Sequence, residues 1–136
     1  MPTIRIREAA ELLGVSDDTV RRWIDDGNLS SATDESGRMV IAGAELAAYV
    51  SANSGRVPQD PVGVGSSARN RFAGLVTKVT TDKVMAQVEL QCGPFRVVSL
   101  MSSDAVRDLD LELGSVAVAV VKSTTVIVET PPRSEE

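Results

Sequence analysis

The sequence predicts an α+β protein of two small domains, the first mainly helical and the second built from β-strands. Apolar residues recur at helical spacing up to about residue 54, whereas residues 67–130 are rich in valine and threonine and often alternate between apolar and polar. The intervening residues 55–66 contain glycine and proline without a sustained period, which indicates a flexible linker. We therefore expect domains at 1–54 and 67–130, followed by a disordered tail at 131–136.

The composition excludes several classes of protein. Hydrophobic residues make up 43% of the 136 positions, yet no apolar run is long enough to cross a bilayer, and the N-terminus lacks the pattern of a secretory signal. We expect a cytoplasmic protein without a membrane partner. Histidine is absent and Cys92 is the single cysteine, so the usual zinc sites and the Ser-His-Asp and Cys-His catalytic sites are excluded. We therefore expect that the protein is not an enzyme.

The N-terminal half has the pattern of two short helices joined by a tight turn. The apolar residues of 6–13 share one helical face, and Gly14 is suited to end that helix. Ser16 is a good N-cap for a second helix, which Gly27 stops. Beyond it, residues 30–41 predict a hairpin that turns at Glu35-Ser36-Gly37, and residues 44–50 predict a closing helix.

This half resembles the helix-turn-helix of MerR-like and excisionase-like proteins. The resemblance rests on Ala9-Ala10-Glu11-Leu12-Leu13-Gly14-Val15-Ser16, Thr19-Val20-Arg21-Arg22-Trp23-Ile24 and Gly27-Asn28-Leu29. In that family the second helix enters the major groove of DNA and a β wing follows, so the resemblance implies a winged helix-turn-helix. The residues that it places against bases or phosphates are Ser16, Thr19, Arg21, Arg22 and, on the wing, Arg38.

The charge of this half opposes strong DNA binding by a single copy. Residues 1–54 contain five arginines, no lysine and nine acidic residues, a net charge of −4. Several copies acting together would restore affinity, and the alternative is that the domain contacts proteins instead. For the individual residues, the alternatives are that Ser16 only caps, Thr19 only packs and the arginines are solvated.

The C-terminal half predicts a small β-barrel. Strands are expected at 71–80, 83–90 and 95–101, and the short turns between them give a three-stranded meander. A short helix at 105–109, capped by Ser102-Ser103-Asp104, interrupts before strands at 116–121 and 125–128. Five strands and one short helix are typical of an OB-like barrel.

The predicted barrel opens with Ser67-Ala68-Arg69-Asn70 and has Lys122-Ser123-Thr124-Thr125-Val126 near its end. With these two segments it resembles molybdate-binding Mop, or TOBE, domains, although the commonest family pattern has alanine at Ser123 and serine at Thr125. The resemblance implies a molybdate or tungstate oxyanion bound by hydrogen-bond donors and cations, without ligation of the metal by side chains. The oxyanion-binding residues that we expect are Ser67, Ala68, Arg69, Asn70, Ser102, Lys122, Ser123 and Thr125. The alternatives are that Ser102 only caps, that Thr124 and Thr125 only form strand, and that Lys122 extends into solvent from the strand end. Arg71 and Lys78 are expected to be solvated.

The resemblance also implies an assembly and a function. In the family the oxyanion sites lie between barrels, so one barrel per chain implies a homo-oligomer, and we favour a hexamer over a dimer. The expected function is a molybdate- or tungstate-responsive transcription regulator that binds a DNA operator. The alternative is a molybdate storage or homeostasis protein whose helical domain serves assembly or protein contacts.

Overall fold

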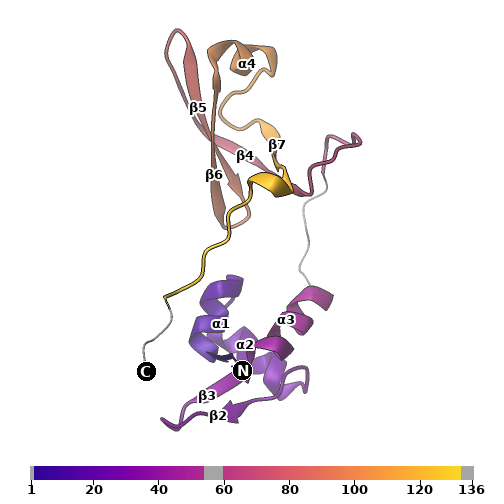
Figure 1. Ribbon diagram of the computed structural model, residues 1–136, viewed down its shortest axis with the longest axis vertical. Helices are drawn as coiled ribbons and strands as arrows, with labels where there is room; N and C mark the ends of the chain where they lie inside the picture. The colour runs from indigo at the N-terminus through magenta and orange to yellow at the C-terminus, as the bar shows by residue number, and fades with distance from the viewer. Residues whose placement is uncertain (1, 54–59, 133–136) are drawn as a thin grey trace. The chain divides into compact units, whose positions relative to one another are not determined.

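The computed structural model describes residues 2–53 and 60–132, and the contacts divide the chain into two units, Met1–Val57 and Pro58–Glu136 (Figure 1). Residues 55–59 of the expected linker and 133–136 of the expected tail lie outside the described residues. Among the residues that are described, no helix is long and apolar enough to cross a membrane.

The first unit packs three short helices against a small antiparallel sheet. Its helices are α1 (Ile6–Leu13), α2 (Asp17–Asp25) and α3 (Gly43–Ala52). Its strands β1 (Thr3–Arg5), β2 (Ala32–Thr33) and β3 (Met39–Ala42) pair in the order β1-β3-β2. The buried members of its core are Ile6, Ala9, Ala10, Val20, Leu29, Ile41 and Leu46. The two helices of the helix-turn-helix pattern and the closing helix are thus confirmed.

The turns of this unit follow from its glycines and capping side chains. Gly14 adopts a left-handed φ of 68°, and its N–H donates to the carbonyls at the end of α1. The Ser16 hydroxyl accepts from the Thr19 N–H at 3.1 Å and so caps α2. The expected hairpin is present between β2 and β3, where the Asp34 carboxylate accepts from the N–H groups of Ser36 and Arg38 at 2.9 Å each.

The second unit is a four-stranded antiparallel sheet with one helix. It contains β4 (Asn70–Thr81), β5 (Met85–Cys92), β6 (Phe95–Ser102), α4 (Ser103–Asp108) and β7 (Val116–Val121). The strands pair in the order β6-β5-β4-β7, so the expected meander of β4, β5 and β6 is confirmed. The buried members of its core are Val76, Ala86, Val88, Leu90, Cys92 and Val106.

The long strand β4 organises this sheet, because its first half pairs with β7 and its second half pairs with β5. The change of partner occurs around Gly74 and Leu75. A Cβ atom at Gly74 would lie 2.4 Å from the Gln91 carbonyl oxygen and 2.7 Å from the Cys92 sulfur. The close approach of β4 and β5 therefore requires glycine at this position.

The expectation of a fifth strand at 125–128 is wrong for the single chain, because the sheet of the described residues has four strands. The chain instead forms a 3₁₀ turn at Ser123–Thr125, in which the Thr125 N–H and hydroxyl both donate to the Lys122 carbonyl. Val126 continues in an extended conformation, and Ile127 is 84% exposed. The β-branched residues of 125–128 have strand propensity, but no strand edge pairs with them here.

Gly74→Ala is expected to lower the free energy of unfolding by about 2 kcal/mol, because the added methyl group must displace the Gln91 carbonyl. Gly65→Ala is the matched control, since nothing lies within 4 Å of a Cβ built at Gly65. Chemical denaturation followed by circular dichroism measures both variants. Equal stability of the two would contradict the steric role of Gly74.

Candidate functional site

Two of the segments expected to bind an oxyanion meet at one end of the second sheet. β4 begins there with Asn70 and β7 ends there with Val121, and these two residues are paired. The Asn70 side-chain amide also donates to the Val121 carbonyl at 3.2 Å. Arg69 and Lys122 are the next residues outward on the two strands. The pairing therefore brings Ser67–Asn70 and Lys122–Thr125 to neighbouring strand ends.

This strand end is rich in exposed hydrogen-bond donors. Arg69, Lys122, Ser67 and Ser123 are all exposed, and no ion pair of the described residues involves Arg69 or Lys122. Two cations beside two hydroxyl groups form a donor set that suits an anion whose oxygens only accept hydrogen bonds.

Two of the expected donors already have partners within the chain. The N–H of buried Ala68 donates to the Ser66 hydroxyl at 3.1 Å. The Thr125 hydroxyl donates to the Lys122 carbonyl at 2.8 Å, which closes the 3₁₀ turn. Ser66 is not among the site residues expected from the sequence, although a serine two residues before a constrained backbone N–H is a common local pattern.

The interpretation of Arg71 as a solvated side chain is wrong. Its Nε lies 2.5 Å from Oδ2 of Asp60, its Nη2 lies 3.5 Å from Oδ1, and its side chain is only 22% exposed. The hydrogen bond from Arg71 is the main cause that lowers the pKa of Asp60, and the N–H of Val62 adds to it. Asp60 belongs to the expected linker, so no local pattern indicated a partner eleven residues away.

Ser102 lies at the opposite end of the sheet. It pairs with Met85, next to the end of β4, whereas Asn70 begins β4. Twelve strand residues span up to about 40 Å. The Ser102 hydroxyl accepts from the Ala105 N–H at 3.0 Å, which confirms that it caps α4. A single chain therefore does not bring Ser102 to Arg69 and Lys122.

The residue after Ser102 has a structural role that sequence analysis missed. Ser103 is 2% exposed, and its hydroxyl lies within hydrogen-bond distance of the carbonyls of Asp82 (2.7 Å) and Met85 (3.1 Å). The Asp82 carboxylate accepts from the N–H groups of Val84 and Met85, which lowers its pKa. These bonds fix the β4–β5 turn to the start of α4.

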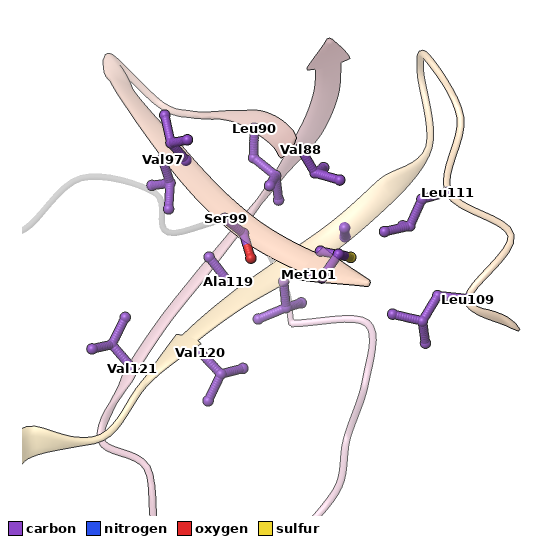
Figure 2. Close-up of a pocket in the computed structure, with 13 residues that line it drawn as sticks. Val88, Leu90, Val97, Ser99, Met101, Leu109, Leu111, Ala119, Val120 and Val121 are labelled. Carbon is purple, nitrogen blue, oxygen red and sulfur yellow. The ribbon is translucent and has the colours of Figure 1, made fainter. Parts of the chain in front are cut away.

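An apolar groove of about 270 Å³ separates the two edge strands of the sheet (Figure 2). Figure 2 shows side chains of β6 and β7 lining it, together with Leu109 and Leu111 from the loop that follows α4. Ser99 supplies its one polar side chain. No cation of the described residues lines the groove, so it is unsuited to an oxyanion. It lies where the edge strands β6 and β7 remain unpaired with each other, which leaves the barrel open on this side.

Metal ligation and thiol chemistry have no built site in the described ranges. Within residues 2–53 and 60–132, no three histidine, cysteine, aspartate or glutamate side chains gather to hold a metal ion. Cys92 is buried in the core of the second unit, and its burial raises the pKa of the thiol. Its sulfur lies 3.6 Å from the Phe72 carbonyl oxygen, which is consistent with packing alone.

In the first unit, the arginines expected to contact DNA differ in their ion pairing from the other two arginines. Arg5 pairs with Asp34 at 3.7 Å and Arg7 with Glu11 at 3.8 Å. Arg21, Arg22 and Arg38 are exposed and take part in no ion pair of the described residues. Arg21 lines a small pocket with Met39 of β3, so the exposed side of α2 lies beside the hairpin.

The hydroxyl groups at the start of α2 are engaged with each other. Ser16 caps the helix, and its hydroxyl lies 2.9 Å from that of Thr19. Thr19 is half-buried, whereas Asp17 and Asp18 of the first turn are exposed. The exposed cations of this surface are therefore the arginines, and carboxylates lie next to them.

Comparison with known proteins gives a match in each half. A helix-turn-helix domain family matches residues 3–54, and the TOBE domain family matches residues 66–128. The chain is 38% identical over 66 residues to the molybdenum transport protein ModE of Herbaspirillum seropedicae, which covers 48% of this chain and 24% of that protein. It is 40% identical over 63 residues to molybdenum-pterin-binding protein 3 of Clostridium pasteurianum, covering 46% of this chain and 93% of that protein.

Among solved structures, the cytoplasmic molybdate-binding protein ModG, crystallised with molybdate bound, is similar with a TM-score of 0.50 and 36% identity. The similarity covers 53% of this chain and 52% of that one. The chain thus spans about a quarter of ModE and about half of ModG, but nearly all of the pterin-binding protein.

Proposed function

Because the chain belongs to the TOBE-domain family of the molybdenum-pterin-binding proteins and also contains a helix-turn-helix domain, we propose that it is an oligomeric, molybdate- or tungstate-binding transcription regulator. In this proposal, residues 1–54 form the DNA-binding domain and residues 67–130 form the oxyanion-binding domain. The protein is proposed to be cytoplasmic and to have no catalytic activity. The single observation that carries it is that Arg69 and Lys122, both exposed, flank the paired residues Asn70 and Val121 at neighbouring strand ends.

The chemistry of this strand end fits a tetrahedral dianion. Arg69 and Lys122 supply positive charge, and Ser67 and Ser123 supply hydroxyl donors. The anion is held through its oxygens, so histidine and cysteine ligands are not needed. Contributions from the Ala68 N–H and the Thr125 hydroxyl require their present bonds to be exchanged for bonds to the anion.

The distribution of the remaining residues supports a site between subunits. Since Ser102 and Lys122 lie at opposite ends of one sheet, an oxyanion that contacts both must lie between two copies of the chain. The open groove between β6 and β7 and the exposed residues Val126–Val128 also favour assembly. We propose that this segment of one copy fills the groove of another and completes a five-stranded barrel, with a hexamer favoured over a dimer.

DNA binding is proposed to use α2 and the hairpin. Arg21, Arg22 and Arg38 are available for phosphates or bases, whereas Ser16 acts chiefly as the helix cap. Each acidic helix-turn-helix domain, here called a head, is expected to bind DNA weakly. Affinity for the operator then comes from several heads on one assembly. Oxyanion binding between subunits would then favour one arrangement of the heads and change the affinity for the operator.

The acidity of the helical domain favours a second candidate function. Asp17 and Asp18 lie exposed at the start of α2, and they oppose the approach of phosphates. A molybdate storage or homeostasis protein would retain the oxyanion site and use this domain for assembly or protein contacts. A gel-shift assay with DNA from upstream of the gene distinguishes the two functions.

Lys122→Ala is expected to weaken molybdate binding by about 10- to 100-fold, because a charge-assisted hydrogen bond is lost. Lys78→Ala removes the same charge from an exposed position on β4 and should change affinity by less than about twofold. Isothermal titration calorimetry with molybdate, tungstate and sulfate measures the effect. Equal losses in the two variants would refute the proposed site.

Ile127→Lys is expected to reduce the assembly to smaller species, because it places a charge in a segment proposed to be buried against a second copy. Each aliphatic side chain buried there contributes about 1.5–3 kcal/mol. Val64→Lys is the control, since Val64 is 63% exposed and lies outside any strand. Native mass spectrometry gives the outcome, and an unchanged mass for the Ile127 variant argues against this interface.

Arg21→Ala is expected to weaken operator binding roughly 5- to 10-fold and to reduce the salt dependence of binding. Arg7→Ala makes the same change of charge on α1, at a residue paired with Glu11, and should have the smaller effect. Fluorescence anisotropy at several salt concentrations, with and without saturating molybdate, measures both. DNA affinity that does not respond to molybdate would exclude the sensor mechanism.

A further inference from the structure

The segment that precedes the barrel is tied back onto it by an ion pair. Asp60 and Arg71 form two contacts, at 2.5 and 3.5 Å, and both side chains are partly shielded from solvent, with exposures of 36% and 22%. The pair closes a loop from residue 60 to residue 71, and Ser67–Asn70 lie inside this loop. The four residues expected to open the oxyanion site therefore lie within a loop whose two ends are joined by the ion pair.

The loop has further internal contacts that restrict its shape. The Asp60 carboxylate also accepts from the Val62 N–H at 2.9 Å, and Gly63 supplies a turn with a φ of 64°. The Ser66 hydroxyl accepts from the Ala68 N–H. At the far end, Asn70 binds the Val121 carbonyl next to Lys122. These bonds restrict the loop near Asp60, before Ala68 and at the strand end.

We infer that Asp60 and Arg71 are positioning residues of the oxyanion site, because their ion pair holds Ser67–Asn70 beside Lys122. The inference rests on the proposed oxyanion-binding function. Neither residue needs to touch the anion. Arg71 is neutralised by Asp60, so the cations left for the ligand are Arg69 and Lys122.

Electrostatics alone predicts the opposite effect of removing Asp60. A carboxylate near the site repels a dianion, so its loss should raise the affinity, and a released Arg71 would raise it further. A positioning role predicts that the affinity falls, because the loop loses its closing contact and must be ordered when the ligand binds. The sign of the change therefore separates the two explanations.

The experiment measures molybdate binding to the full chain by calorimetry. Asp60→Asn is expected to bind molybdate about fivefold more weakly, because one partly exposed charge-assisted contact is lost. Glu89→Gln is the matched control, because it removes a carboxylate from the Arg96 ion pair on β5 and β6, and it should bind as the wild type does. The exchange of both charges, Asp60→Arg with Arg71→Asp, is expected to restore affinity to within about twofold.

Amide hydrogen exchange gives a second readout without ligand. Asp60→Asn should speed exchange within residues 66–70, whereas Glu89→Gln should not. Unchanged or tighter molybdate binding by Asp60→Asn, a failed charge exchange, or unchanged amide exchange would each overturn the positioning role. The absence of molybdate binding by the wild type would instead contradict the proposed function, and the amide exchange would then decide whether the loop is closed as inferred.

Discussion

The antiparallel pairing of β4 with both β7 and β5 is the constraint on which the second unit depends. One twelve-residue strand takes part in two of the three ladders of the sheet, and Gly74 permits the close approach of β4 to β5. The same pairing brings Asn70 opposite Val121, and with it the two segments that contain Arg69 and Lys122. The proposed oxyanion site thus depends on sheet register, because a shift of one residue would turn its side chains to the other face.

The sheet also determines what a single chain lacks. Its edge strands β6 and β7 remain separated by an apolar groove, while Val126–Val128 extend without a partner among the described residues. Ile127 and Val128, more than 80% exposed, are costly to leave in water, and unpaired strand edges invite pairing with another chain. Because Ser102 is also remote from Lys122, a second copy would complete both the proposed barrel and the proposed site.

Local patterns in the sequence were sufficient for most of the fold. Helical periodicity, Gly14 and the Ser16 cap defined the helix-turn-helix, and the turn at Asp82 defined the meander, because each signal lies within a few residues of the element it specifies. Three features were missed because no local pattern of the sequence specifies them. β1 is too short to show a period, Arg71 binds a residue of the expected linker, and the segment 125–128 has strand propensity but no edge within its own sheet.

In the proposed function, both halves of the chain depend on further copies of the chain, each for a different physical reason. In the proposed assembly, another copy covers the apolar surface of the β-rich unit and brings a Ser102 near Lys122, since neither is achieved within one sheet. The helical unit has a net charge of −4 over residues 1–54, so a single head neutralises few phosphates, whereas linked heads gain effective concentration. If an oxyanion stabilises contacts between barrels, it also fixes how many heads bind together. Ligand binding could then control DNA affinity through assembly, without any change of shape within a head.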